Sequence, residues 1–184
     1  EIDTNLAVKW AKLITAFGAS DSKHTTQTKN MDYINGSLYL SGMMKGGFAP
    51  YGEEEARIAS KSTPLNGFVI KCDASNGEWL GGVSADEQGI GGYFGVAKGK
   101  ENNLYAYGYS WATPNKGICL TTIDESSWEK TEKIALITET GMGTAWSCLA
   151  DGTNFYSFSR GNKAVNFYNS EFTLPAPTGW GMFI

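Results

Sequence analysis

The chain has 184 residues, 23 of them glycine, with 13% aromatic residues, 18% charged residues and a formal net charge of -4. Abundant aromatic residues and a small net charge exclude intrinsic disorder, and the high glycine content with few charges excludes a coiled coil. The sequence contains no run of about 18 apolar residues, so no transmembrane helix is indicated. It also contains no basic stripe, which argues against a nucleic-acid surface. This composition is typical of an all-β protein with many tight turns.

The first predicted element is a strand over residues 5–15, which matches the last strand of a repeat unit. A first complete unit follows over residues 28–83. Its Asn35-Gly36 pair favours positive φ at both residues and predicts a tight hairpin turn between the first two strands. We expect Lys45–Pro64, between the second and third strands, to be a loop insertion. The third and fourth strands are predicted over Gly67–Cys72 and Glu78–Val83.

Two further units repeat this order of strands. The second covers residues 93–136 and the third covers residues 144–175, with hairpin turns at Asn102-Asn103 and Asp151-Gly152. The apolar segment 178–184 matches the first strand of another unit. Four antiparallel strands in each unit predict the blades of a β-propeller. The expected fold is therefore all-β, a β-propeller or partial propeller built from four-stranded antiparallel blades, in one domain over residues 1–184.

The strand pattern also predicts a buried core and an incomplete ring. The residues expected at equivalent inward positions are Leu38, Leu40, Val69, Leu104, Ile118, Leu120, Phe155 and Val165. Three whole units and two partial ones are too few for the usual ring of four or more blades. We therefore expect the chain to be part of a larger ring. Its end strands would be covered by further blades of the same chain, a second copy or another protein.

The strongest resemblance to a known group lies in the first unit. The stretch Asn35-Gly36-Ser37-Leu38-Tyr39-Leu40-Ser41-Gly42, then Gly67–Asp73 and Gly77-Glu78-Trp79, resembles the repeat of bacterial β-propeller proteins. Residues 73–79 are also similar to the repeats of quinoprotein-like propellers. Such bacterial repeats are common in secreted and surface proteins of Bacteroidetes. The resemblance implies a blade geometry and an extracellular, cell-surface or periplasmic location, and it implies no single activity.

The titratable residues form no recognisable catalytic or metal-binding set. His24 is the only histidine and lies in a polar stretch, so neither a triad nor a zinc site is indicated. Asp124 and Glu125 are adjacent in a predicted turn, an arrangement that suits an acid/base pair poorly. Glu53-Glu54-Glu55 is interpreted as a solvated charge run rather than a cation site. The widely spaced cysteines, Cys72, Cys119 and Cys148, are predicted to be buried free thiols. We predict no catalytic residue, metal ion or cofactor.

The aromatic residues give the candidate ligand-binding positions. Tyr105, Tyr107, Tyr109 and Trp111 alternate along one strand, and a period of two places them on one face. One interpretation is that this row packs against a neighbouring blade. The other is that its Trp111 end reaches the rim of the propeller, where aromatic rings can stack on the C–H faces of sugars. The candidate ligand-binding residues are Tyr51, Tyr109 and Trp111, with Phe48 as a further rim candidate in the insertion.

These features predict a non-catalytic secreted or cell-surface module that binds a ligand or serves as a scaffold. Loops on a rigid framework would present its binding residues to a glycan or protein ligand. The alternative is a propeller enzyme, such as a lyase, a hydrolase or a quinoprotein-like protein, whose active residues lie partly outside this chain. A third hypothesis is a subunit of a larger surface assembly.

Overall fold

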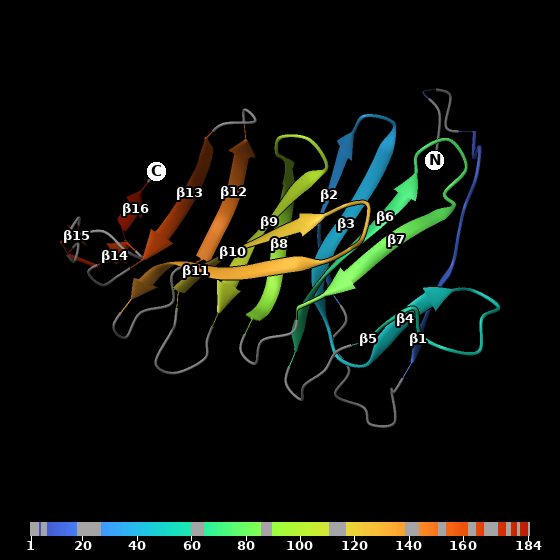
Figure 1. Ribbon diagram of the computed structural model, residues 1–184, viewed down its shortest axis with the longest axis horizontal. Helices are drawn as coiled ribbons and strands as arrows, with labels where there is room; N and C mark the ends of the chain where they lie inside the picture. Colours follow the sequence, from blue (N-terminus) through green and yellow to red (C-terminus); the bar gives the residue numbers. More distant parts are fainter. Residues whose placement is uncertain are drawn as a thin grey trace.

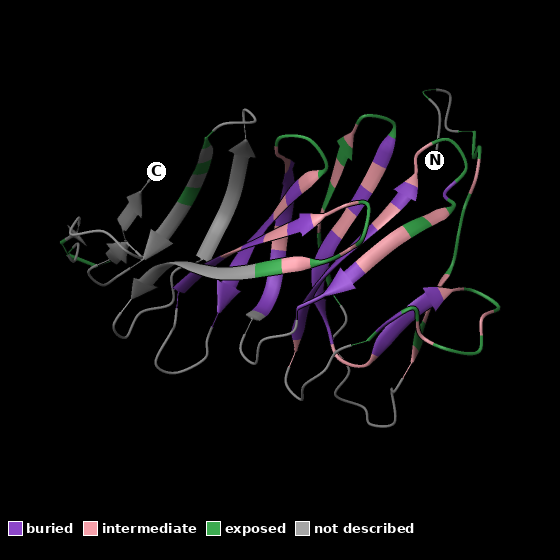
Figure 2. Cartoon of the chain, in the orientation of Figure 1, coloured by how far each residue is buried: buried purple, intermediate pink, exposed green. Residues whose placement is uncertain are grey.

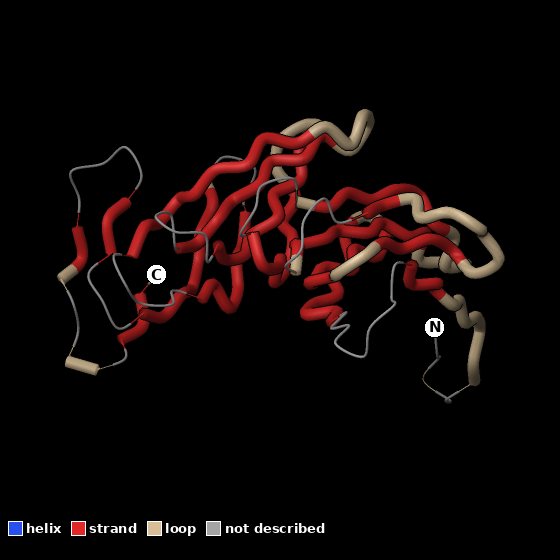
Figure 3. The backbone as a smooth tube through the Cα atoms, turned by 90° about the horizontal axis from the view of Figure 1, so that it is seen from below, coloured by secondary structure: helices blue, strands red, loops and turns tan. Residues whose placement is uncertain are grey.

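The computed structural model describes residues 4, 7–17, 27–59, 65–85, 90–110, 117–138, 144–150, 154–161, 165–167, 173–175, 178–179 and 181–183. These residues form strands, turns and loops, so the predicted all-β fold is confirmed. Figure 1 shows antiparallel sheets that follow one another in a row along the longest axis. Figure 3, the view from below, shows strands throughout the described chain. Within these ranges, no helix has the length and apolar character that crossing a bilayer requires.

The first predicted unit forms a four-stranded antiparallel sheet, which we call the first sheet. Its order is β2-β3-β6-β7, and its strands are Gln27–Ile34, Ser37–Met44, Asn66–Asp73 and Trp79–Ser84. The predicted hairpin turn is present, because Asn35 and Gly36 have φ values of 48° and 80°. Asn and Gly tolerate this left-handed backbone at low cost, so the turn sets the register Ile34↔Ser37 between the first two strands.

The second predicted unit forms the core of a larger sheet, the second sheet. Strands β8 (Ile90–Lys98), β9 (Asn103–Ser110), β10 (Gly117–Asp124) and β11 (Lys130–Thr138) pair in the predicted order. The turn before β9 differs from the predicted one, since the positive φ of 55° falls on Glu101 rather than on the Asn pair. Gly99 donates its N–H to the carbonyl of Asn103, which closes a longer turn than in the first unit.

The turn between third and fourth strands is the same in both units. Asp73 Oδ1 accepts the backbone N–H of Ser75 at 2.7 Å, and Asp124 Oδ1 accepts that of Ser126 at 2.8 Å. The residue four places after each aspartate has positive φ, 72° at Gly77 and 59° at Trp128. Side-chain oxygens that bind their own backbone stabilise such turns. The repeat inferred from the sequence is therefore a repeat of hydrogen bonds as well as of strands.

The expected third unit, residues 144–175, does not form a four-stranded sheet of its own. Strands β14 (Val165–Phe167) and β15 (Thr173–Leu174) extend the second sheet, where β14 pairs with β11. Pairing with β14 satisfies backbone groups that the outer edge of β11 would otherwise expose. Strand β13 (Phe155–Gly161) instead pairs with β12 (Thr144–Ala150) on one side and with β16 (Gly181–Phe183) on the other, in a third sheet. The prediction that 178–184 begins a further unit is therefore wrong, because β16 pairs with β13 where a third strand was expected.

The loop expected over Lys45–Pro64 contains two strands. Strands β4 (Gly47–Pro50) and β5 (Ile58–Ala59) pair with each other, and β1 (Ile14–Phe17) pairs with β4, which makes a small sheet. Phe48 and Ile58 are buried, and the ring of Phe48 meets that of Phe68 edge-on with centroids 5.1 Å apart. The segment is a strand pair because it buries apolar residues on the first sheet. Of the predicted strand 5–15, only residues 14–15 fall in a strand of the described chain, β1, which pairs in this small sheet rather than completing a blade.

Two opposite faces of each sheet can be distinguished by period-two alternation. We call front the face of the first sheet that carries Leu38 and the face of the second sheet that carries Leu104. The back faces are the opposite ones, which carry Tyr39 and Tyr105. The back face packs on the front face of the second sheet through one apolar cluster of buried residues, coloured purple in Figure 2. Its members are Tyr39, Val69, Val83, Ala85, Tyr93, Val96, Leu104, Ala106, Cys119 and Ile123. A second cluster, which includes Met44, Phe48 and Phe68, lies between the front face and the small sheet.

Polar groups connect the first two sheets around this cluster. Glu125, in the β10–β11 turn, accepts hydrogen bonds from Lys71 Nζ at 2.8 Å, from Lys98 Nζ and from the hydroxyl of Tyr39. Its side chain is only 8% exposed. Asp32 of the first sheet accepts the backbone N–H of Val96 at 3.0 Å. The bonds of Lys71 and Tyr39 to Glu125 and that of Asp32 to Val96 join residues from different sheets, so they fix how the two sheets are placed relative to each other. The bond from Lys98 lies within the second sheet and holds the Glu125 side chain in place.

The predicted core is confirmed in part. Val69, Leu104 and Ile118 are buried, with exposed fractions of 0%, 0% and 2%. Leu38, Leu40 and Leu120 are only half-buried. Two other predicted core side chains, Phe155 and Val165, lie outside the described part of the structure. Leu38 and Leu40 are on the front face of the first sheet, which no four-stranded sheet covers among the described residues.

We predict that Leu104→Ala lowers the free energy of unfolding by about 2–5 kcal/mol, because it removes a fully buried side chain and leaves a cavity. Leu38→Ala, at the equivalent position of the first sheet, should cost clearly less because Leu38 is half-buried. Urea unfolding followed by tryptophan fluorescence measures both. Equal losses in the two variants would show that the two positions are equally buried in solution.

We also predict a pH-dependent contribution from Glu125. Burial alone would raise the pKa of its carboxyl, but hydrogen bonds from Lys71, Lys98 and Tyr39 outweigh burial and hold the pKa below its usual value. The stabilisation is therefore present above the unfolded-state pKa of about 4.3 and is lost as the pH falls through the lower folded-state pKa.

Glu125→Gln tests this contribution. The variant should lose about 1–3 kcal/mol at pH 7, since hydrogen bonds to charged groups contribute about 1.5–3 kcal/mol and the lysine ends are partly exposed. The difference between wild type and variant should shrink as the pH falls toward 3. Asp73 and Asp124 titrate in both proteins, so a difference that is constant with pH would contradict the assignment.

Candidate binding groove on the first sheet

A groove of about 820 Å³ lies over the front face of the first sheet. Its floor is the sheet itself, and its walls are the extended residues 7–13, which we call the strap, and the end of β4. A volume of 300–1,000 Å³ is usual for ligand sites in proteins. The lining residues are Trp10, Ala11, Lys12, Leu13, Ile14, Met31, Leu38, Leu40, Pro50, Tyr51, Arg57, Cys72, Gly77, Glu78 and Trp79.

The strand registers explain why the floor is apolar. Met31 pairs with Leu40, and Leu38 pairs with Cys72, which in turn pairs with Trp79. Directly opposed residues point to the same side of a sheet, so all five side chains lie on the front face. The sequence alternates here so that Tyr39 and Lys71 point to the other side, toward the second sheet. The floor therefore offers aliphatic and sulfur atoms and few hydrogen-bonding groups.

The strap is placed by three contacts. The indole Nε1 of Trp10 donates to the carbonyl of Ala74 at 3.2 Å, and the backbone N–H of Tyr51 donates to the carbonyl of Leu13 at 3.0 Å. Gly77 makes the third contact possible, because a Cβ there would lie 2.6 Å from the Trp10 ring and 2.7 Å from the Lys12 side chain. Its positive φ also favours glycine. Most strap residues are exposed, so the strap covers the groove only thinly.

Charged side chains lie at the rim. Arg57 donates from Nε to Glu53 Oε2 at 2.8 Å, and the two side chains are 45% and 34% exposed. An ion pair this exposed contributes little and exchanges readily with water or a ligand. Glu54 and Glu55 are exposed, which agrees with their interpretation as a solvated run. Lys12 and Glu78 complete the charged rim.

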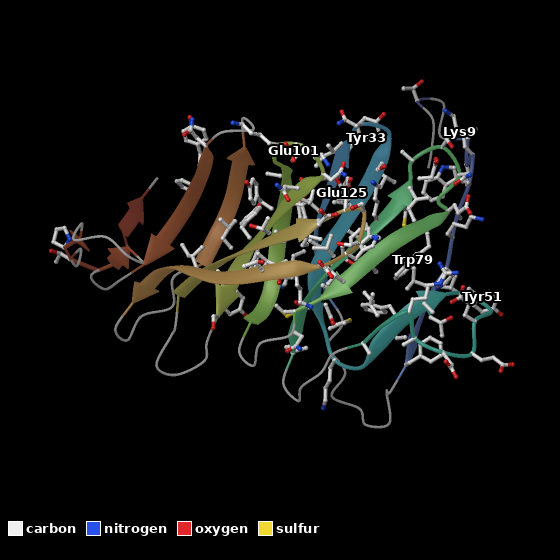
Figure 4. The ribbon with its side chains drawn as sticks, in the orientation of Figure 1. Lys9, Tyr33, Tyr51, Trp79, Glu101 and Glu125 are labelled. Atoms are coloured by element: carbon white, nitrogen blue, oxygen red, sulfur yellow. The ribbon has the colours of Figure 1, made fainter. Side chains whose placement is uncertain are left out.

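Trp79 separates the groove from a smaller hollow of about 370 Å³. That hollow reaches Trp128, whose ring lies directly over Gly81, where a Cβ would collide with it. Arg57 lines both spaces. Figure 4 shows Trp79 and Tyr51 near the end of the first sheet that the strap crosses. A ligand in the groove could thus meet Trp10, Trp79 and Tyr51.

The two predicted ligand residues that the structure describes, Tyr51 and Tyr109, lie in different places. Tyr51 is 71% exposed at the groove rim, as a binding residue would be. Tyr109 is 8% exposed in β9, with its ring 5.3 Å from that of Phe94, and burial raises the pKa of its hydroxyl. Its ring therefore offers no open stacking face. Trp111 lies outside the described residues, and Phe48 is buried against Phe68.

The groove residues missed by the sequence analysis are Trp10 and Trp79. Trp79 was interpreted only as part of a repeat motif, and Trp10 only as part of a strand. The available signal was the alternation of the first unit, which places Leu38 and Leu40 together on the front face. The aromatic residues nearest to that face, in strands 5–15 and 78–83, were the better candidates.

The structure also locates some of the titratable candidates. Asp124 binds its own turn and Glu125 points into the contact between sheets, so the two do not act on one site. Cys72 and Cys119 are buried free thiols, as predicted, and burial raises the pKa of Cys72. His24 lies outside the described residues. Within the described ranges, no group of three or more His, Cys, Asp or Glu side chains could hold a metal ion.

No protein-family model matches the sequence, and a search of curated proteins finds none that is similar to it. The groove is therefore interpreted from its own chemistry.

We predict that Trp10→Ala increases the rate at which a thiol reagent modifies Cys72 at the groove floor. Removing the indole deletes its bond to Ala74 and its packing on Gly77, so the strap should lift. Mass spectrometry after a timed reaction with iodoacetamide identifies the modified cysteine, and Cys119, which is 0% exposed, serves as the internal reference. Val8→Ala, an exposed strap position, is the control. An unchanged rate at Cys72 in Trp10→Ala would show that Trp10 does not hold the strap.

Proposed function

We propose that this chain is a non-catalytic binding and scaffold module, and that the groove on the first sheet takes apolar side chains of a protein ligand. The observation that carries the proposal is the apolar floor of the groove with exposed apolar residues beside it. Leu13, Met31 and Tyr51 line the groove and are 63%, 60% and 71% exposed. Contiguous exposed apolar residues with a charged rim are typical of protein interaction sites.

The chemistry of the floor favours a protein over a glycan. A sugar ring could stack on Tyr51 or Trp79, but its other hydroxyls would face Leu38, Leu40 and Met31 without hydrogen-bond partners. Burying a hydroxyl without a partner costs about 1–3 kcal/mol. An aromatic or aliphatic side chain has no such cost and gains about 25 cal/mol for each Å² removed from water. The glycan stays the second ligand class, and the test below includes it.

The finer fold assignment belongs to the same proposal. Consecutive antiparallel sheets that stack face to face, with a repeated turn at Asp73 and Asp124, support a propeller-like arrangement. The resemblance to bacterial propeller repeats supports an extracellular, cell-surface or periplasmic location. A scaffold in that setting would use a rigid stack of sheets to present its groove.

The test selects peptides from a random displayed library on the immobilised protein and screens the same protein on a glycan array. We predict enrichment of peptides with aromatic or large aliphatic residues. For a selected peptide, Tyr51→Ala and Leu13→Ala should each weaken the dissociation constant about tenfold, which corresponds to ~1.4 kcal/mol. Bound peptide should also slow the modification of Cys72.

Val8→Ala is the matched control, because Val8 is 66% exposed on the strap but does not line the groove. Its affinity for the peptide should equal that of wild type. Glycan binding that depends on Tyr51, with no peptide enrichment, would show that the ligand is a sugar rather than a protein. Binding of either kind that survives both Tyr51→Ala and Leu13→Ala would remove the groove as the site.

A further inference from the structure

Equivalent residues of the first two sheets differ in burial according to whether another sheet stacks on them. Met31 and Val96 hold the same place in their hairpins, opposite Leu40 and Ala106, yet Met31 is 60% exposed and Val96 is 5% exposed. All of these residues are apolar. The difference arises because the back face of the first sheet covers the front face of the second, while the front face of the first sheet is open over β2.

The opposite end of the row carries an open face of the complementary kind. Tyr156 follows Phe155 in β13 as Tyr39 follows Leu38 in β3, so both tyrosines belong to back faces. Tyr39 is 2% exposed in the contact with the second sheet, whereas Tyr156 is 47% exposed and Phe158, two residues later on the same side, is 38% exposed. The third sheet thus presents two aromatic side chains where the first sheet presents its buried tyrosine.

We propose that these two faces bind each other between copies of the chain, so that the back face of the third sheet of one copy stacks on the front face of the first sheet of the next. This rests on the proposed function, because it takes the groove face to be a protein-binding surface. Within one molecule, a back face already covers a front face, between the first and second sheets. The second copy would repeat that arrangement between molecules.

The positions of the faces determine the geometry of association. The first sheet and strands β12 and β13 of the third lie on opposite sides of β8 and β9 in Figure 1, so the two faces that meet come from different copies. The strap covers the β6–β7 side of the front face through its contact with Gly77. The second copy would therefore stack on the β2–β3 side, where Met31 is exposed. Contacts between two different surfaces are head-to-tail, and they build rings or open chains rather than symmetric dimers.

Sedimentation or light scattering over a concentration series tests the association. The mass of wild type should rise above the monomer mass of 19.9 kDa as the concentration increases. Met31→Glu places a charge on the front face of the first sheet, and Tyr156→Glu places one on the back face of the third. Each variant alone should remain at 19.9 kDa. Lys100→Glu, in the exposed β8–β9 turn, is the control and should associate as wild type does.

Mixing the two variants separates head-to-tail from symmetric association. The Tyr156→Glu chain keeps an intact front face of its first sheet, and the Met31→Glu chain keeps an intact back face of its third sheet. An equimolar mixture should therefore form a species of twice 19.9 kDa that grows no further. Circular dichroism confirms that both variants are folded. A mixture that stays monomeric while wild type associates would overturn the head-to-tail contact.

Wild type that stays monomeric at every concentration would overturn the inference entirely. Peptide binding that depends on Tyr51, measured on that same monomer, would then leave the proposed function standing with a different partner. If wild type neither associates nor binds peptide through Tyr51, both proposals are overturned.

Discussion

Stacking of one apolar sheet face on another is the interaction on which the rest of this structure depends. The back face of the first sheet and the front face of the second share a cluster that includes Tyr39, Val69, Tyr93 and Leu104, each 2% exposed or less. Sheets that each keep apolar residues on a face must cover that face with another element. The polar bonds of Glu125 and Asp32 surround this cluster and orient the sheets, but the buried area supplies the stabilisation.

The groove follows from the same constraint. The first two sheets each have an apolar front face, and the front face of the second sheet is covered by the first sheet. The first sheet has only the strap and the small sheet over its front face, so part of that face stays accessible and becomes the groove. The groove thus lies on the face whose equivalent in the second sheet is buried. Its apolar character reflects the architecture, and its charged rim, with Arg57 and Glu53, comes from the inserted β4–β5 segment.

The repeat pattern could be predicted from the sequence where local chemistry dictates the backbone. Asn35-Gly36 and the Asp73 and Asp124 turns specify their own hydrogen bonds, so the four strands of the first two units were placed correctly. The alternation of residues in β3 and β9 predicted the face on which each side chain lies, but not how deeply it is buried. Leu38 and Leu104 hold equivalent positions in the sequence, and their burial differs because the first sheet covers Leu104 while no four-stranded sheet of the described chain covers Leu38. The insertion was mistaken for a loop because its apolar residues, Phe48 and Ile58, are few and separated. The sequence could not predict that β14 pairs with β11 of the second sheet, or that the strap packs on Gly77. Both features depend on contacts between segments that are distant in the sequence.

The central claim is that the front face of the first sheet is an open sheet-stacking surface, and methionine oxidation tests it most directly. Met31 is 60% exposed on that face, while Met43 and Met44 of β3 are 7% and 0% exposed. In dilute protein, peroxide should oxidise Met31 much faster than Met43 and Met44, as read by mass spectrometry of the peptides. As the protein concentration rises, oxidation of Met31 should slow while the other two stay protected. A Met31 rate that is as slow as that of Met44 in dilute protein, or that is independent of concentration, would contradict the account.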